Sequence, residues 1–310
     1  MQFRKSLSII TYHYIKKKTK KNNGLNFLEI KNFINQLNYL KKKYSILDPE
    51  EAKHLLKNNL PLNKKFCWLT FDDGYREHYD VVFQELEKRK IKGSFFPVVT
   101  AVTKKKILEV NKIQFILSEL NKDLLLSEIE KYYKKKKYRL TFNSFIKKIN
   151  LKTLFDDKKT FLIKGLLQRY LPESDRLELT SYFFKKYLKN KDKEDFKKIY
   201  LNIGHLKEMY KNGHEIGIHT YDHPHLNSLT EEKQKFQINK SIKFLKKNNL
   251  MQNNLTINYP YGSYNFITKK ICKENKHIGF GLTSNNGIIK LNKKDNLTLP
   301  RIDTNNLLKN

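Results

Sequence analysis

The sequence predicts an α/β fold in which parallel strands form a barrel or an open sheet, with a mostly helical insertion at about residues 104–200. Short apolar segments alternate with segments of helical periodicity both before Lys104 and after Tyr200. Repeated strand-then-helix units with short connections are typical of parallel sheets. Between Lys104 and Tyr200 this alternation stops, and apolar residues recur mainly at helical spacing.

Each expected element has its own local signal. Short apolar runs predict strands at residues 7–14, 44–47, 66–73, 93–99, 213–219, 257–262, 277–283 and 296–302. Apolar spacing predicts helices at 30–40, 79–90 and 266–275 and, within the insertion, at 113–120, at 162–170 and after Asp175. Asp48 followed by Pro49 is typical of a helix start, and predicts a helix toward Asn58. Ser228-Leu229-Thr230-Glu231 resembles a capping box, which predicts a long helix to about Asn249.

Composition indicates a folded chain with a strongly basic surface. The 310 residues can bury a substantial core, and we expect one domain over residues 1–310 rather than two smaller units. The net charge of +32 comes mostly from lysines spread along the chain, whereas arginines, which make bidentate phosphate contacts, are few. We therefore expect a solvated surface and no specific nucleic-acid partner. A basic surface would also favour an anionic substrate carrier, such as a nucleotide or a lipid phosphate.

The cysteines and the first residues bear on the compartment. Two isolated cysteines, Cys67 and Cys272, provide neither a disulfide framework nor a paired-cysteine metal site, which fits a reducing environment. The apolar stretch after the basic first residues is too short for a signal peptide. No run of about 18 apolar residues is present, so no membrane span is expected. The simplest expectation is a cytoplasmic protein, and no feature indicates its oligomeric state.

Two neighbouring carboxylates, Asp72 and Asp73, follow a predicted strand and precede Gly74. Ligands bind at the carboxyl ends of parallel strands in α/β folds. Because side chains alternate in direction along a strand, one carboxylate can face a metal ion while its neighbour faces a water from another side. An Asp-Asp-Gly sequence alone would also fit an ordinary polar turn.

A histidine cluster far downstream favours the functional interpretation of these carboxylates. His219 and His223 lie four positions apart, after another short apolar strand. One carboxylate and two imidazoles can hold a first-row metal ion and leave a position for water, as catalytic zinc sites do.

Two segments resemble the first two motifs of the polysaccharide deacetylases, the NodB homologues of carbohydrate esterase family 4. They are Thr70-Phe71-Asp72-Asp73-Gly74 and His219-Thr220-Tyr221-Asp222-His223-Pro224-His225-Leu226. The resemblance implies a distorted (β/α)7 barrel and metal-dependent removal of acetyl from an N-acetylated sugar. It also implies that Asp73, His219 and His223 hold Zn²⁺ or another divalent first-row ion, with Asp72 as the general base.

Tyr259-Pro260-Tyr261-Gly262 resembles the third motif of the family, which implies that the Tyr261 backbone N–H stabilises the oxyanion. The chain departs from the pattern at Asn258, where many members carry an arginine oriented against the catalytic aspartate. Arg301 is a candidate for that missing cation, the alternative being an exposed arginine after a strand. The later motifs, an Asp/Trp segment and a segment that supplies a histidine general acid, are not apparent.

A branch of the family carries the acid histidine at the end of the first strand, in a Tyr-His pair that Tyr12-His13 resembles. We therefore assign His13 as the general acid; the alternative is a histidine satisfied within the core. The remaining histidines are interpreted as surface or packing residues, because His214 begins a strand, His225 enters a loop, and no motif surrounds His54, His78, His205 or His277.

The leading hypothesis is a metal-dependent hydrolase that deacetylates an N-acetylated sugar or glycan, free or linked to a nucleotide or a lipid. Two alternatives stay open, because a fold alone does not fix a function. One is hydrolysis of another non-peptide C–N bond on the same barrel. The other is a non-catalytic carbohydrate-binding protein, which would not require Asp72.

Overall fold

The computed structural model describes residues 5–19, 25–149, 157–188, 198–289 and 295–307. Contacts divide the chain into two compact units. The first, Met1–Lys17, Phe27–Lys106 and Lys197–Asn310, contains the sheet. The second is Lys18–Asn26 and Ile107–Phe196, and takes up most of the range where the sequence predicts an insertion. The expectation of one domain over residues 1–310 stays a prediction.

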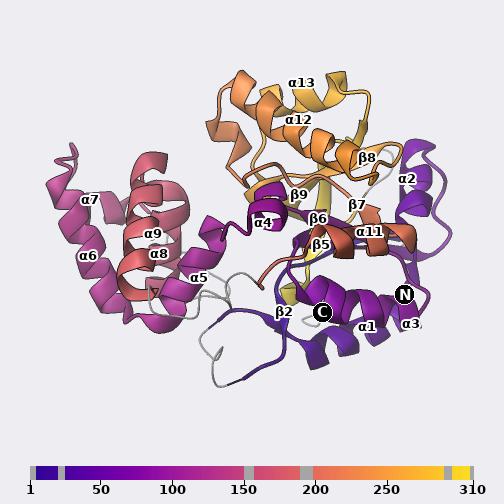
Figure 1. Ribbon diagram of the computed structural model, residues 1–310, viewed down its shortest axis with the longest axis horizontal. Helices are drawn as coiled ribbons and strands as arrows, with labels where there is room; N and C mark the ends of the chain where they lie inside the picture. The colour runs from indigo at the N-terminus through magenta and orange to yellow at the C-terminus, as the bar shows by residue number, and fades with distance from the viewer. Residues whose placement is uncertain (1–4, 20–24, 150–156, 189–197, 290–294, 308–310) are drawn as a thin grey trace. The chain divides into compact units, whose positions relative to one another are not determined.

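A curled parallel sheet forms the centre of the first unit (Figure 1). Its main strands follow one another around the sheet in chain order: β1 (Ser6–Tyr12), β5 (Lys65–Asp73), β6 (Ser94–Pro97), β7 (Glu215–Ile216), β8 (Leu255–Asn258), β9 (Ile278–Asn286) and β10 (Leu299–Asp303). β10 pairs in parallel with β1, and a parallel bridge from Ile218 to Ile257 connects the segment after β7 to β8. The sheet thus curls back on itself, which confirms the predicted (β/α)7-type barrel.

Three further short strands complete the pairing. β4 (Ser45–Ile46) lies alongside β5, and β2 (Ile15–Lys16) pairs with β3 (Leu28–Glu29) apart from the main sheet. β1 ends at Tyr12, two residues earlier than the sequence predicts, and β9 runs three residues further, to Asn286.

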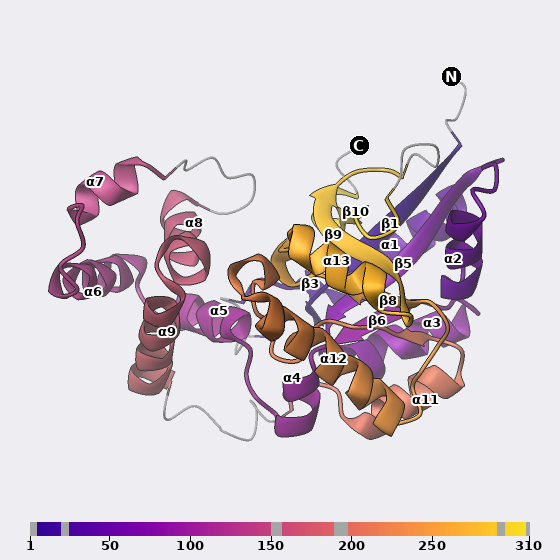
Figure 2. The same ribbon diagram turned by 90° about the horizontal axis from the view of Figure 1, so that it is seen from above.

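Helices follow the strands as the alternating pattern predicts. They are α1 (Ile30–Lys43), α2 (Pro49–Lys57), α3 (Gln84–Lys88), α4 (Val99–Lys104), α11 (Ile203–Lys211), α12 (Glu231–Lys247) and α13 (Phe266–Glu274), and a π-helical segment, His78–Phe83, precedes α3. Figure 2 shows α12 and α13 beside β8 and β9. Buried side chains such as Phe33 and Leu37 of α1 join one core with the outward-facing Leu69 of β5.

The inside of the barrel changes from apolar to polar along the strands. Leu7, Ile9, Trp68 and Phe96 belong to an apolar cluster that is separate from the core under the helices. Side chains two residues apart point to the same face of a strand, so Asp72 follows Trp68 on the inner face of β5. Asp72 therefore lies inside the barrel, at the end where the strands have their carboxyl termini.

One of the two predicted helix starts is confirmed and the other is wrong. Asp48 and Glu51 form a capping box at the start of α2. α12 instead begins after Thr230, whose hydroxyl accepts from the Lys233 amide. Ser228 lies in a 3₁₀ turn, Leu226–Ser228, and donates its hydroxyl hydrogen back to the His225 carbonyl, so it does not cap the helix.

The described part of the second unit is helical. Its elements are α5 (Glu109–Glu119), α6 (Lys122–Lys135), α7 (Phe142–Lys147), α8 (Lys158–Gly165), a π-helical segment (Leu166–Tyr170) and α9 (Glu173–Leu188). They share an apolar core of their own, which includes Ile116, Ile129 and Phe183. α9 begins before Asp175, which accepts from the Tyr132 hydroxyl. Within the described residues of both units, every helix is too short or too polar to cross a membrane.

Gly217 tests the packing of the barrel interior. A Cβ at this position would lie 2.3 Å from Phe96 Cε1 and 2.8 Å from the Thr256 carbonyl oxygen. We expect Gly217→Ala to lower the free energy of unfolding by about 1–3 kcal/mol through overpacking, measured by urea denaturation. Gly287→Ala is the control, because its nearest neighbour would be Pro300 Cβ at 3.3 Å. Equal stability of the two variants would contradict this account of the interior.

Candidate active site

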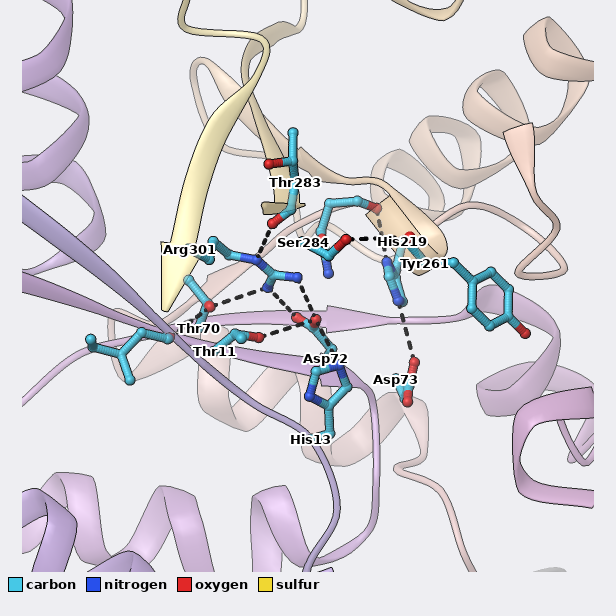
Figure 3. Close-up of polar contacts among 12 residues, drawn as sticks. Thr11, His13, Thr70, Asp72, Asp73, His219, Tyr261, Thr283, Ser284 and Arg301 are labelled. Atoms are coloured by element: carbon cyan, nitrogen blue, oxygen red, sulfur yellow. Dashed lines mark hydrogen bonds and ion pairs between the residues drawn. The ribbon is translucent and has the colours of Figure 1, made fainter. Parts of the chain in front are cut away.

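The last two residues of β5 place their carboxylates in different surroundings. Asp72 and Asp73 are both buried, and Figure 3 shows the first directed toward Arg301 and the second toward His219. Asp73 has φ of 70° and Gly74 has φ of 75°, so the chain turns sharply where the strand ends. Gly74 is required there, because a Cβ would lie 2.9 Å from Pro97.

Positive φ recurs among the residues around the site. Thr220, His223 and Tyr261 adopt this conformation as Asp73 does. Left-handed conformations of non-glycine residues cost free energy and gather where a site needs a particular geometry. Together with Asp73, they lie on three of the segments that meet at the site, whereas six further non-glycine residues with positive φ lie elsewhere among the described residues.

Asp73, His219 and His223 form a candidate metal site. Their ligand atoms lie within 4.8 Å of one another, and each imidazole Nε2 is 3.3 Å from Asp73 Oδ1. His219 Nδ1 donates to the Asn258 carbonyl at 2.8 Å, which leaves Nε2 as the ring atom that faces the carboxylate. Burial lowers the pKa of His223, which favours its neutral form. Electron pairs that converge in this way are stabilised by a cation between them, so the donor set fits a divalent metal ion.

Tyr75 forms a hydrogen bond to the carboxylate of this candidate metal site. Its hydroxyl donates to Asp73 Oδ2 at 3.0 Å, and so it restrains the carboxylate while Oδ1 faces the two imidazoles. The Tyr75 ring stacks on Tyr14, with centroids 4.4 Å apart. This is the kind of hydrogen bond that orients a metal ligand.

Arg301 holds Asp72 with two hydrogen bonds. The guanidinium donates from Nη1 to Oδ1 at 2.9 Å and from Nη2 to Oδ2 at 2.8 Å. It is itself 4% exposed and donates from Nε to the Thr283 carbonyl. Burial alone would raise the pKa of Asp72, but the charge of Arg301, with His13 nearby, holds it well below its ordinary value. The structure thus shows a buried cation at Arg301, not an exposed arginine.

Asn258 does not replace the arginine that many family members carry at its position. Its side chain is buried, and its amide makes no hydrogen bond to any residue that the structure describes. Asn258 contributes through its backbone instead, since its carbonyl oxygen accepts from His219. The cation beside Asp72 comes from β10 rather than from β8.

His13 lies beside Asp72 at the solvent side of the site. Its Nε2 is 3.3 Å from Asp72 Oδ2, and its side chain is 47% exposed. A histidine satisfied within the core would be buried, so that alternative does not fit the structure. The His13 side chain is therefore accessible to solvent while it contacts Asp72.

Tyr261 lies on a 3₁₀ turn, Pro260–Gly262, next to the metal site. Its ring contacts His223 edge to face at 4.6 Å and stacks on His225 at 4.1 Å. Ser284 donates its hydroxyl hydrogen to the Tyr261 carbonyl. The ring of Tyr261 is therefore in contact with a metal candidate, and His225 lies nearer the site than its loop position indicates.

Several residues of the site carry no signal that the sequence reasoning used. Tyr75 follows the first motif directly, and its place in the sequence could have suggested a role. Thr11, whose hydroxyl donates to Asp72 at 3.3 Å, and Thr283 have no such signal. His214 is confirmed as a packing residue, because it is fully buried between Glu87 and the Gly93 amide at the start of β7.

Comparisons with known proteins identify the family of the chain. The family model described as polysaccharide deacetylase matches residues 59–125 and 153–280, which is more than half of the chain. No curated protein shows a significant match.

Solved structures show the same fold at low sequence identity. The Streptococcus pyogenes deacetylase PplD, in complex with acetate, is 21% identical, with a TM-score of 0.59 over 96% of this chain and 92% of that one. IcaB from Ammonifex degensii is 17% identical, with a TM-score of 0.59 over 98% and 94%. A de-N-acetylase from Aggregatibacter actinomycetemcomitans is 13% identical, with a TM-score of 0.55 over 96% and 94%. By the extent of the family match, this chain belongs to the polysaccharide deacetylases, hydrolases that act on non-peptide C–N bonds.

Proposed function

We propose that the chain is a metal-dependent deacetylase that hydrolyses the acetamido group of an N-acetylated sugar or glycan. The observation that carries the proposal is the separation of Asp72 and Asp73, one paired with a guanidinium and the other facing two imidazoles. The family acts on acetylated sugars and glycans. A nucleotide- or lipid-linked substrate and a cytoplasmic location stay predictions from the sequence.

Asp73, His219 and His223 would hold the metal ion. When bound, a divalent ion of this kind supplies Lewis acidity, which acidifies water and polarises an amide carbonyl. Zn²⁺ suits this donor set, as do other divalent first-row ions. The three side chains come from two segments that the barrel brings to one edge.

Asp72 is the proposed general base. It is ionised, it is next to the metal candidates in sequence, and its carboxylate orientation is fixed by two hydrogen bonds from Arg301. In the reaction it accepts a proton from the attacking water, whose oxygen forms the new bond to the acetyl carbon. Thr11 and Arg301 keep the carboxylate in place during this transfer.

His13 and Tyr261 would complete the reaction. His13, half-exposed and 3.3 Å from Asp72, donates a proton to the sugar nitrogen as the C–N bond breaks, giving acetate and an amine. The Tyr261 backbone N–H would donate to the oxyanion of the tetrahedral intermediate. The turn that contains Tyr261 packs closely against Ser284, since a Cβ on Gly262 would lie 2.0 Å from Ser284 Oγ.

Asp72→Asn tests the proposed base. The amide keeps the shape of the side chain but cannot accept the proton, so we expect acetate release from an N-acetylated glucosamine oligomer to fall about 10²–10⁴-fold. Metal content, measured by elemental analysis, should stay that of the parent. Asp222→Asn is the matched control, because Asp222 pairs with Lys106 at the surface and takes no part in the site. Parental activity in Asp72→Asn would refute the assignment.

Arg301→Met tests the buried ion pair. The change leaves Asp72 charged and buried without its guanidinium partner, so we expect the free energy of unfolding at neutral pH to fall by about 3–5 kcal/mol. Adding Asp72→Asn to this variant should recover part of the loss, because the buried charge is removed. Urea denaturation of the two single variants and the double variant measures the coupling.

Arg76→Met serves as the control for this cycle. Arg76 pairs with Asp80 on an exposed surface, where such pairs contribute about 0–1 kcal/mol. If Arg301→Met lowers stability no more than Arg76→Met does, the Arg301 guanidinium does not compensate the charge of Asp72.

A further inference from the structure

We propose that His78 is a positioning residue, which holds the backbone of His13 and so keeps the His13 imidazole beside Asp72. This inference rests on the proposed role of His13 as general acid. No motif surrounds His78 in the sequence, and the reaction described above does not use it. The role follows from one hydrogen bond and from the surroundings of the His78 ring.

The His13 carbonyl lies outside the sheet and needs another partner. The register between β1 and β5 ends with Tyr12 opposite Phe71, so His13 is one residue beyond the ladder. His78 Nε2 lies 2.8 Å from the His13 carbonyl oxygen. Because a carbonyl oxygen only accepts, His78 must carry its proton on Nε2 and donate it.

Aromatic side chains fix the His78 ring. It is fully buried and lies edge-on to Phe71 and Tyr75, with centroids 5.7 Å apart in both cases, and 6.0 Å from Phe95. Phe71 immediately precedes Asp72, and Tyr75 donates to the metal candidate Asp73. The ring that holds His13 is therefore packed against the same strand end that presents both carboxylates.

Such surroundings would suit an apolar ring better than an imidazole. Burial lowers the pKa of His78 to about 4, so the ring is neutral at neutral pH. A buried polar ring is costly unless it is hydrogen-bonded. Among the described residues its Nδ1 has no partner, so the hydrogen bond to His13 is the contact that favours histidine here.

The consequence concerns the distance between His13 and Asp72. His13 reaches Asp72 Oδ2 at 3.3 Å with a side chain that is half-exposed. Release of its carbonyl would let the imidazole move away from Asp72. A displacement of about 1 Å at a catalytic group can lower a rate about 10²-fold.

The test compares two variants of His78 in the zinc-loaded chain. We expect His78→Leu to lower kcat about 10–100-fold, with KM and metal content unchanged, because the contacts given for His78 are to the His13 carbonyl and to aromatic rings rather than to a metal candidate. We expect His78→Gln to recover most of this loss, since its side-chain amide can donate to the same carbonyl. His214→Leu is the matched control: it removes another buried histidine that packs on Phe95, but at the start of β7, and should lower Tm while kcat stays parental.

A second measurement does not depend on activity. In the His78→Leu variant, ¹⁵N relaxation of the His13 amide should give an order parameter that falls from about 0.85 toward 0.6, whereas His78→Gln should stay near the parent. Equal loss of kcat in the Leu and Gln variants, or an unchanged His13 order parameter, would make His78 a packing residue only. A parent that binds zinc but releases no acetate would overturn the proposed function, and the His13 order parameter would still decide whether His78 holds that segment.

Discussion

The left-handed turn at Asp73 and Gly74 sets the geometry of the whole site. Two adjacent carboxylates repel each other when both are ionised, and each needs its own compensating group. The turn directs Asp73 to the imidazoles of His219 and His223, while Asp72 stays on the inner face of β5. Glycine at position 74 permits this turn, because a Cβ there would lie too close to Pro97 on the neighbouring strand. One backbone constraint therefore separates the carboxylate that faces the two imidazoles from the carboxylate that pairs with Arg301.

Closure of the sheet explains how Asp72 is paired with the cation of Arg301. β10 lies next to β1, and β1 lies next to β5, so Arg301 reaches Asp72 across the barrel interior. The family pattern takes this cation from the position of Asn258 on β8. Because the carboxyl ends of the parallel strands meet at the same edge of the barrel, a side chain from either strand can lie beside Asp72.

The features of the fold and of the site that depend on local sequence patterns could be predicted from the sequence. Strand and helix alternation predicts the barrel, and two motifs predict that Asp73, His219 and His223 meet, which they do. Contacts between distant segments had no local signal. The pairing of Arg301 with Asp72 requires the closed sheet, the hydrogen bond of His78 requires the end of β1, and the position of the Thr230 cap depends on a turn that occupies Ser228.

The most direct test of this account is the position of the metal ion. Crystals of the zinc-loaded chain, measured at the zinc absorption edge, should show one anomalous peak bound by Asp73, His219 and His223, with Asp72 on Arg301 and outside the coordination sphere. The His219→Ala, His223→Ala double variant should lack the peak and the bound zinc. A peak bound by Asp72, or no zinc in the parent, would contradict the division of roles between the two carboxylates.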